Sequence, residues 1–327
     1  MKVFLSHPPA AVSLYYGARA LRQLRAVAEV VLNPHDDDLT PQRLLALAGD
    51  ADCIVSYRQL AAGEQLFASL PRLRAFVRCA VDIRNIDVDA ASRHGVLVTQ
   101  ASAGFSAAVA EWIVGAMLAL SRQLCDYVQG HRSGHPRAAT MGRELRNTTL
   151  GLVGYGQIAR YLDPIARALQ MRLLVHDPFA AVDDAMRAPS LAHLLGAADH
   201  VVSLAAATEQ THNLFDAAAF AQMRPGSYFI NASRGQLVDE AALLAALDSG
   251  HLAGAALDVG RAADQMPPVR LAGHPRVIAT PHIGGLTTPA IEHQALETVQ
   301  QVIDIAAGRT PAGAVNTAQA YRWKSPA

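Results

Sequence analysis

Two glycines and a distant acid form the pattern in this chain that is best suited to binding a dinucleotide. Residues 154–159 read GYGQIA, a G-x-G-x-x-A turn, and Asp177 lies 21 residues after Gly156. The first glycine permits a tight turn, and the second lets backbone N–H groups approach a pyrophosphate at a helix N-terminus. An acid about 20 residues further on accepts hydrogen bonds from a ribose. The spacing therefore predicts a dinucleotide site, with an ordinary structural turn as the alternative.

The residues after Asp177 distinguish between the two nicotinamide cofactors. Pro178 and Phe179 follow it, with neither Arg nor Lys beside them. A carboxylate repels the 2′-phosphate of NADP, and no adjacent cation offsets that repulsion. We therefore expect the cofactor to be NAD.

The hydrophobic pattern around the turn is typical of a βαβ unit. Apolar runs at 150–153 and 173–176 predict two buried strands, and apolar positions from 158 to 169 recur at helical spacing. Pro164 falls inside this predicted helix, where it removes a hydrogen bond and should kink the axis.

Polar residues follow four more predicted strands. These strands raise the count to six, which indicates a doubly wound sheet whose ligands bind beyond the carboxyl ends of the strands. The strands are predicted at 200–204, 228–230, 254–259 and 277–280, and the polar strand ends are Asp177, residues 231–235 (NASRG), Asp258 and residues 281–285 (PHIGG).

The first hundred residues predict a second α/β unit that lacks a glycine fingerprint. Short apolar runs alternate with helical patterns, as in a parallel sheet. Strands are expected at 3–5, 53–56, 75–78 and 96–98, and helices at 42–48, 64–69 and 87–94.

The overall composition is that of a globular protein with a large core. The 327 residues are 51% hydrophobic and 17% charged, which suggests two domains. The 28 Lys and Arg balance the 28 Asp and Glu, so nothing favours a nucleic acid or a membrane as partner. Cys53, Cys79 and Cys125 are odd in number, which argues against disulfides. Since the N-terminus also lacks a signal-peptide pattern, we expect a reducing cytoplasm.

Two histidine-containing stretches are weak candidates for metal binding. Residues 35–38 (HDDD) fit turn chemistry better, because Asp bonds its own backbone. His131 and His135 could share a metal only on a helix, and a nearby Gly and Pro predict that 130–146 is a loop. We therefore expect no metal site.

Several segments resemble the D-isomer-specific 2-hydroxyacid dehydrogenase family, in particular its glyoxylate/hydroxypyruvate reductase-like members. They run in the family's order and cover most of the chain, so they are more specific than the glycine turn alone. The segments are VDIRNIDVDAASRHGVLVTQ at 81–100, AVAEW at 108–112, the fingerprint at 151–159, NASRGQLVDE at 231–240, GAALDV at 254–259 and ATPHIGG at 279–285.

The resemblance implies an α/β fold with two domains. A Rossmann cofactor domain, built on a doubly wound parallel sheet, would span 102–285. A smaller flavodoxin-like α/β substrate domain would combine 1–101 with 286–327, and a helix over 289–307 would carry the chain back to it. The family also implies a homodimer joined through the region 107–146.

The family's reaction is hydride transfer between nicotinamide and C2 of a small D-2-hydroxy or 2-keto acid. Arg234 matches the arginine that grips the carboxylate and carbonyl oxygen, for which a planar guanidinium is suited. His282 matches the acid/base, since imidazole titrates near neutral pH. Asp258 matches the acid that accepts from the nicotinamide carboxamide. The structural alternatives are a surface ion pair for Arg234, a satisfied buried histidine for His282 and a turn cap for Asp258.

The resemblance therefore implies two catalytic residues, Arg234 and His282, and a larger set that binds ligands. Substrate binding is expected from Ala80, Val81 and Arg234. Cofactor binding is expected from Gly154, Gly156, Gln157, Ile158, Asp177, Ala232, Ser233, Arg234, Asp258, His282, Gly284 and Gly285.

The sequence departs from the family pattern at two places. The family has a Glu five residues after the Asp258 position, and here Ala263 stands there, with Asp264 as a shorter substitute. The family's Gly-x-Gly-x-Asp-like loop is replaced by residues 79–82, with Ile83 and Arg84 inserted after it. Arg84 and Arg58 could favour an extra anionic group on the substrate, or could simply be surface residues.

Two other functions compete with the dehydrogenase. One is a non-catalytic NAD(H)-sensing protein of the same fold, which the missing Glu favours and which Arg234 and His282 disfavour. The other is a dehydrogenase for a different small anion, such as formate or phosphite.

Overall fold

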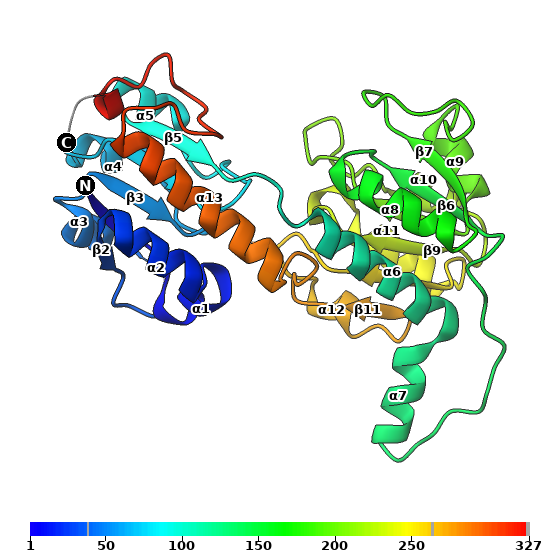
Figure 1. Ribbon diagram of the computed structural model, residues 1–327. Coiled ribbons are helices and arrows are strands. Elements are labelled where there is room, and N and C mark those ends of the chain that lie inside the picture. Colours follow the sequence, from blue (N-terminus) through cyan, green and yellow to red (C-terminus); the bar gives the residue numbers. More distant parts are fainter. Residues whose placement is uncertain (38, 263–264, 325–327) are drawn as a thin grey trace. The chain divides into compact units, whose positions relative to one another are not determined.

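The chain divides into two compact units. The computed structural model describes residues 1–327 except 38, 263–264 and 325–327. The first unit comprises Met1–Phe105 and Thr288–Ala327, and the second comprises Ser106–Thr287 (Figure 1). The chain thus leaves the first unit after residue 105 and returns after 287, where the sequence suggested 101 and 285.

The first unit is built on a five-stranded parallel sheet. Its strand order, β2-β1-β3-β4-β5, is that of a flavodoxin-like fold, as expected. The prediction missed β2, an edge strand in which Glu29 is exposed and the other three residues are only partly buried, although Val30–Leu32 is a short apolar run like those of the predicted strands. The strands are β1 (Lys2–Leu5), β2 (Glu29–Leu32), β3 (Cys53–Ser56), β4 (Ala75–Arg78) and β5 (Leu97–Gln100).

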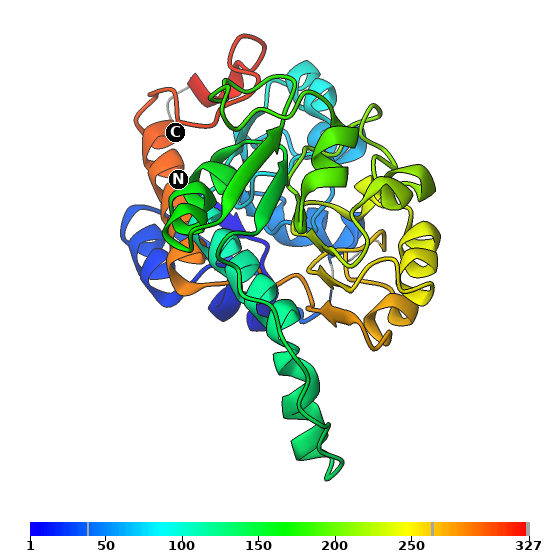
Figure 2. The ribbon, with the colours of Figure 1, turned by 90° about the vertical axis from the view of Figure 1, so that its right-hand side faces the viewer.

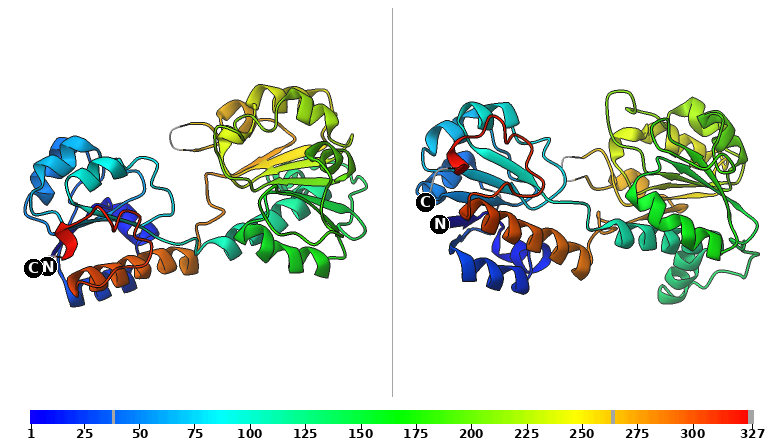
Figure 3. Two further views of the ribbon diagram at one scale, coloured as in Figure 1. Left: turned by 90° about the horizontal axis from the view of Figure 1, so that it is seen from above. Right: turned by 45° about the horizontal axis from the view of Figure 1, so that its top comes forward.

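Helices cover both faces of this sheet. Alternate strand residues Val3, Val55 and Val77 pack with α2 and α13, whereas Phe4, Ile54 and Phe76 pack with helices α3, α4 and α5 on the other face. Figure 3 shows α13 alongside the helices of the N-terminal segment. The helices are α1 (Pro9–Tyr15), α2 (Ala18–Val27), α3 (Pro41–Ala48), α4 (Glu64–Ser69), α5 (Val88–Arg93), α13 (Thr288–Ala306) and the 3₁₀ helix η2 (Arg322–Lys324).

The C-terminal segment is tied to the first unit by hydrogen bonds. Val315 N donates to the Val98 carbonyl, and Val98 N donates to Asn316 Oδ1 at 2.8 Å. The C-terminal segment thus belongs to the first unit.

The second unit contains the predicted six-stranded parallel sheet. Its order is β11-β10-β9-β8-β6-β7, and Arg187 forms a further parallel bridge with Val175 of β7. The chain runs from β6 to β7 on one side and then to β8 on the other, so β6 and β8 flank a topological switch point. The strands are β6 (Thr149–Val153), β7 (Arg172–His176), β8 (His200–Ser203), β9 (Tyr228–Asn231), β10 (Gly254–Leu257) and β11 (Val277–Ala279).

Helix α8 carries the fingerprint, and it runs as one helix through Pro164. A buried stripe of Ala159, Leu162 and Ala166 faces the core. The other helices of this unit are α6 (Ser106–Arg122), α7 (Leu124–Arg132), α9 (Leu191–Ala197), α10 (Ala217–Gln222), α11 (Glu240–Asp248), α12 (Val269–Ala272) and the 3₁₀ helix η1 (Gly235–Leu237), while α8 spans Gln157–Ala168.

The prediction that 130–146 is a loop from its first residue is wrong. Helix α7 continues to Arg132, and the following segment runs back along it (Figure 2). Tyr127 Oη and Thr140 Oγ1 lie 2.9 Å apart, which ties the two together. Tertiary contacts thus override the helix-breaking tendency of Gly130, which is buried. His131 is helical and His135 lies beyond the helix, and the described residues contain no metal-binding cluster.

Among the described residues, no single helix is long and apolar enough to cross a membrane. One pair of helices, α6 with α7, has the length and composition for it, but the pair is bent by 70°.

His200 provides a test of how the second unit responds to acid. The ring is buried, stacks on Tyr228 and shares a 2.9 Å hydrogen bond with Ser121. Burial lowers the pKa of His200 from 6.5 to about 4. The neutral ring therefore contributes stability that is present above pH 6.5 and is lost as the pH falls toward 4. Wild type should lose about 2 kcal/mol more than His200→Gln between pH 7 and pH 5, measured by urea unfolding.

His212→Gln is the matched control, since His212 is exposed. It should keep the wild-type pH dependence. Equal losses in wild type and His200→Gln would contradict the assignment of a buried neutral ring.

Candidate functional site

The glycine turn has the geometry that a pyrophosphate requires. Gly154 has φ +99°, and a Cβ there would lie 2.6 Å from the Ala205 N, so only glycine fits. Gly156 precedes α8, and a Cβ built on it meets no atom within 4 Å. No side chain caps the helix N-terminus. The free N–H groups of the first turn therefore face open space where an anion could be held.

Asp177 is held against this turn. Its carboxylate accepts hydrogen bonds from Tyr155 N at 2.7 Å, Phe179 N at 2.8 Å and Ala180 N at 3.0 Å. Burial opposes ionisation, but the three N–H groups outweigh it and lower the pKa of Asp177. The acid is therefore charged at neutral pH and keeps acceptor capacity for hydroxyl groups.

The residues between the glycines and the acid also fit a dinucleotide. Ala159 is fully buried, which lets α8 pack closely on its neighbours, while Gln157 is exposed and Ile158 is half-buried in the first turn. The uncapped N-terminus of α8, the space beside Gly156 and the charged Asp177 together suit the pyrophosphate and ribose of NAD, the cofactor that the sequence suggests.

Arg234 lies just beyond β9, in a segment held from both sides. Asn231 Nδ2 donates to the Arg234 carbonyl at 3.0 Å, and Ser233 N donates to Asn231 Oδ1. Ser233 Oγ donates to the Ala205 carbonyl, next to the glycine turn. Gly235 packs so tightly on Gly260 that a Cβ would lie 2.0 Å from the Gly260 carbonyl carbon. Arg234 itself and Ala232 are half-buried.

His282 lies in a strained backbone conformation. Its φ is +55°, a left-handed value that costs a non-glycine residue about 1–3 kcal/mol. His282 N donates to the Thr280 carbonyl at 2.9 Å. Strain of this kind persists only where the surroundings impose it, and it is concentrated at functional sites.

Asp258 is the residue that imposes the conformation of this loop. It is 4% exposed and accepts from Thr280 Oγ1 at 2.6 Å, Ile283 N at 2.8 Å and Gly284 N at 2.7 Å. Burial raises its pKa, against the opposing effect of these donors. A side chain at Gly284 would collide with the Asp258 carboxylate. Asp258 therefore caps the loop of His282, Gly284 and Gly285 rather than the turn after its own strand.

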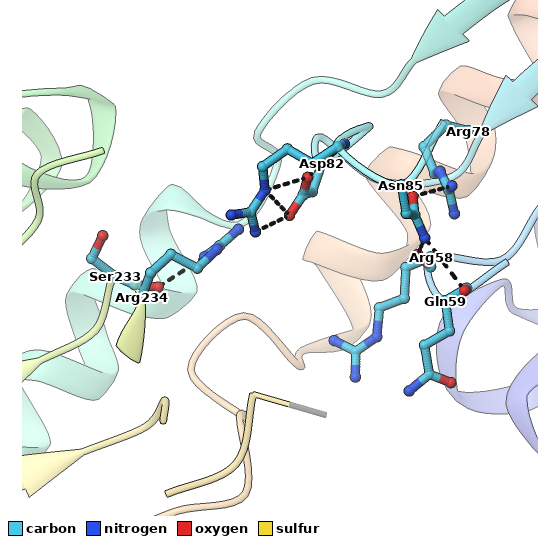
Figure 4. Close-up of polar contacts among 8 residues, drawn as sticks. Arg58, Gln59, Arg78, Asp82, Asn85, Ser233 and Arg234 are labelled. Atoms are coloured by element: carbon cyan, nitrogen blue, oxygen red, sulfur yellow. Dashed lines mark hydrogen bonds and ion pairs between the residues drawn. The ribbon is translucent and has the colours of Figure 1, made fainter. Parts of the chain in front are cut away.

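The expected substrate loop belongs to the first unit. Ala80 and Val81 are half-buried after β4, and the Ala80 carbonyl accepts from Ala101 N at 3.1 Å. Asp82 and Arg84 pair through two parallel hydrogen bonds, of which the shorter is 2.6 Å (Figure 4). Arg84 is exposed, which agrees with the alternative that it is a surface residue.

Arg78 was missed by sequence reasoning, although it lies beneath this loop. It is fully buried and donates to the carbonyls of Tyr57 and Leu60 and, at 2.7 Å, to Asn85 Oδ1 (Figure 4). Burial lowers its pKa to about 10, so it stays charged at neutral pH. An Arg at the end of a short apolar run was the signal that could have found it.

The predicted residues thus fall into four groups. The glycine turn and Asp177 are in contact, as are Asp258 and the loop of His282. A third group, Ala232, Ser233 and Arg234, follows β9, and these three groups belong to the second unit. Ala80 and Val81 belong to the first unit. Ala263 and Asp264, at the position of the family Glu, lie outside the described residues.

The chain is similar to several known proteins. The model for the NAD binding domain of D-isomer specific 2-hydroxyacid dehydrogenases matches residues 114–284, more than half of the chain. An (S)-sulfolactate dehydrogenase from Chromohalobacter salexigens is 39% identical over 266 residues, which are 80% of this chain and 86% of that protein. A D-3-phosphoglycerate dehydrogenase from Bacillus subtilis is 36% identical over 77% of this chain, which spans about half (49%) of that longer protein.

The similarity extends to solved structures. The D-lactate dehydrogenase of Lactobacillus jensenii with NAD⁺ has a TM-score of 0.81 at 24% identity, over 96% of this chain and 99% of that one, which shows the shared fold. The segment matched by the family model contains the glycine turn, Asp177, Arg234, Asp258 and His282. The chain therefore belongs to the D-isomer specific 2-hydroxyacid dehydrogenase family, whose members are NAD-dependent oxidoreductases.

Proposed function

We propose that this dehydrogenase reduces a 2-keto acid that carries a second anionic group at C3, a sulfonate or a phosphate. The observation that supports this most is the state of Arg58. Its guanidinium lies over the Tyr15 ring at 5.1 Å, and no carboxylate or carbonyl of the described residues is within hydrogen-bonding distance of it. An arginine held in place without an anionic partner can accept one from the substrate.

Arg58 lies next to the expected substrate loop. Asn85 Nδ2 donates to the carbonyls of Arg58 and Gln59, both at 3.3 Å, and Asn85 in turn accepts from the buried Arg78 (Figure 4). This network joins the end of β3 to the loop after β4. The Arg58 backbone is therefore held to Asn85, in the loop that begins with Ala80 and Val81, by hydrogen bonds within the first unit.

Arg84 is the weaker candidate for the same task. Its guanidinium already pairs with Asp82, and its own N–H donates to the same carboxylate at 3.0 Å. To bind a substrate anion, Arg84 would first have to give up these bonds. We therefore assign the second anion to Arg58.

The named substrates of the relatives point in the same direction. Sulfolactate and 3-phosphoglycerate each carry an acidic group on C3 besides the carboxylate. In the rules that name stereocentres, the CH2 group that bears the sulfonate ranks above the carboxylate. The label (S) in sulfolactate therefore describes the same spatial arrangement at C2 as that of a D-2-hydroxy acid. The two relatives thus act on acids of one shape.

Arg234 and His282 would carry out the remaining chemistry. Arg234 would hold the substrate carboxylate and polarise the carbonyl oxygen, and His282 would donate the proton that this oxygen takes up on reduction. The bound nicotinamide supplies the hydride. The glycine turn and Asp177 would hold the pyrophosphate and ribose, and Asp258 has one carboxylate oxygen with capacity for the carboxamide beyond its bond to Gly284.

Substrate choice can be tested by NADH oxidation with a panel of keto acids. The panel contains 3-sulfopyruvate, 3-phosphohydroxypyruvate, hydroxypyruvate, pyruvate and glyoxylate. Arg58→Gln should lower kcat/KM about 10–100-fold for the two dianionic acids, because it removes a charge-assisted hydrogen bond. Glyoxylate should change less than about threefold, since it lacks the second group.

Arg25→Gln, an exposed arginine of α2, is the matched control and should leave every substrate unchanged. Arg234→Gln should abolish turnover of all five acids. Equal losses for glyoxylate and 3-sulfopyruvate in Arg58→Gln would reject the proposed substrate class.

The position of the missing Glu has its own test, the pH–rate profile for reduction. A carboxylate beside an imidazole stabilises the protonated form, which is the form that donates the proton. On the alkaline side of the profile, the rate of reduction falls as the histidine loses its proton. In Ala263→Glu this fall should therefore occur at a pH about one unit higher than in wild type. A fall at the wild-type pH would mean that this residue does not act on His282.

We also propose a homodimer formed through the region 107–146. Exposed apolar side chains collect there, with Leu124 and Val128 about half exposed and Met141 almost fully exposed. Val128→Asp should convert the dimer into a single chain, as measured by light scattering after size exclusion. Leu14→Asp changes an equally exposed leucine of the first unit and should leave the mass unaltered. A wild type with the mass of one chain would refute the dimer.

A further inference from the structure

Arg261 lies in the loop after β10, and its guanidinium joins three segments of the second unit. Nε donates to the Val238 carbonyl at 2.8 Å, and Nη2 donates to the Gln236 carbonyl at 3.3 Å. Nη2 also donates to the side-chain oxygen of Asn213. All three acceptors are neutral. Among the described residues, the side chain is therefore held by the directions of its planar donors and not by an ion pair.

The two carbonyls belong to the turn that directly follows Arg234. Residues Gly235–Leu237 form η1, and Val238 then bridges to Phe215. Asn213 N donates to the same Gln236 carbonyl at 2.9 Å. One guanidinium thus fixes the C-terminal side of the segment that carries Arg234.

The other side of the segment has its own anchor. Asn231, at the end of β9, holds the Arg234 carbonyl and Ser233 N. The close approach of Gly235 to Gly260 brings the two loops together and leaves no room for a side chain between them. Arg234 is therefore placed between Asn231 before it and the Gly260–Arg261 loop after it.

We infer that Arg261 is a positioning residue that holds Arg234 in the orientation needed to bind the substrate carboxylate. This inference rests on the proposed role of Arg234. Lysine cannot take the place of Arg261, because an ammonium group lacks the planar fork that reaches carbonyls of two residues and an amide at once. Without this support the Arg234 backbone can shift, and a shift of about 1 Å in a binding group is enough to cost up to about 100-fold.

The test separates binding of the keto acid from binding of NADH. Arg261→Met and Arg261→Lys are measured with the best keto acid of the panel at saturating NADH, and NADH affinity is measured by fluorescence. Both variants should raise KM for the keto acid about tenfold, with kcat within about threefold and the Kd of NADH within about twofold of wild type. Arg270→Met, an exposed arginine of α12, should change none of these.

A second variant keeps the test decisive if either Arg261 variant fails to fold. Asn213→Gly removes one acceptor, leaves Arg261 in place and tolerates the φ of +53° at this position. It should raise KM about threefold. Unchanged KM in Asn213→Gly and in the folded Arg261 variants would overturn the inference, as would a rise in the Kd of NADH with no rise in KM.

Arg234→Gln, measured in parallel, distinguishes the two possible failures. If Arg234→Gln loses turnover and the Arg261 variants behave as wild type, only the positioning role is wrong. If Arg234→Gln keeps wild-type kcat/KM, the proposed function fails and the inference fails with it.

Discussion

The site of the second unit depends on polar side chains at strand ends that hold the backbone of their own or of neighbouring loops. A parallel sheet ends its strands at one edge, where loop N–H groups have no ladder partner and need other acceptors. Asp177, Asn231 and Asp258 supply these acceptors after β7, β9 and β10. The loops that these residues hold lie at the edge of the sheet where ligands bind. One residue can therefore both hold a loop and bind a ligand.

Two arginines perform the converse task of holding carbonyl groups, the buried Arg78 and the partly buried Arg261. Arg78 joins two loops of the first unit, and Arg261 joins three segments of the second. The hydrogen bonds described for both guanidinium groups go to neutral acceptors, so no carboxylate takes part in these bonds. A cation under the expected substrate loop, and Arg58 beside it, make the first unit attractive to anions. The same hydrogen bonds that stabilise these loops thus favour an acidic substrate.

The energetics of the His282 loop show how strain and support balance. A left-handed histidine costs about 1–3 kcal/mol. The three hydrogen bonds to Asp258, at about 1 kcal/mol each, are enough to offset that cost. Removal of the carboxylate would leave N–H groups of this loop without acceptors, which is costly where they are buried.

The sequence by itself determined the fold class, the six strands of the second unit, the glycine turn and the acid that pairs with it. Strands 53–56 and 75–78 were predicted to the residue, because short apolar runs leave a local signal. Only the tertiary structure decided that Glu29 begins an edge strand, that α7 extends through Gly130, and which carbonyls Arg78 and Arg261 hold. The reason is physical, since a hydrogen bond between distant residues depends on how the whole chain packs and leaves no spacing in the sequence.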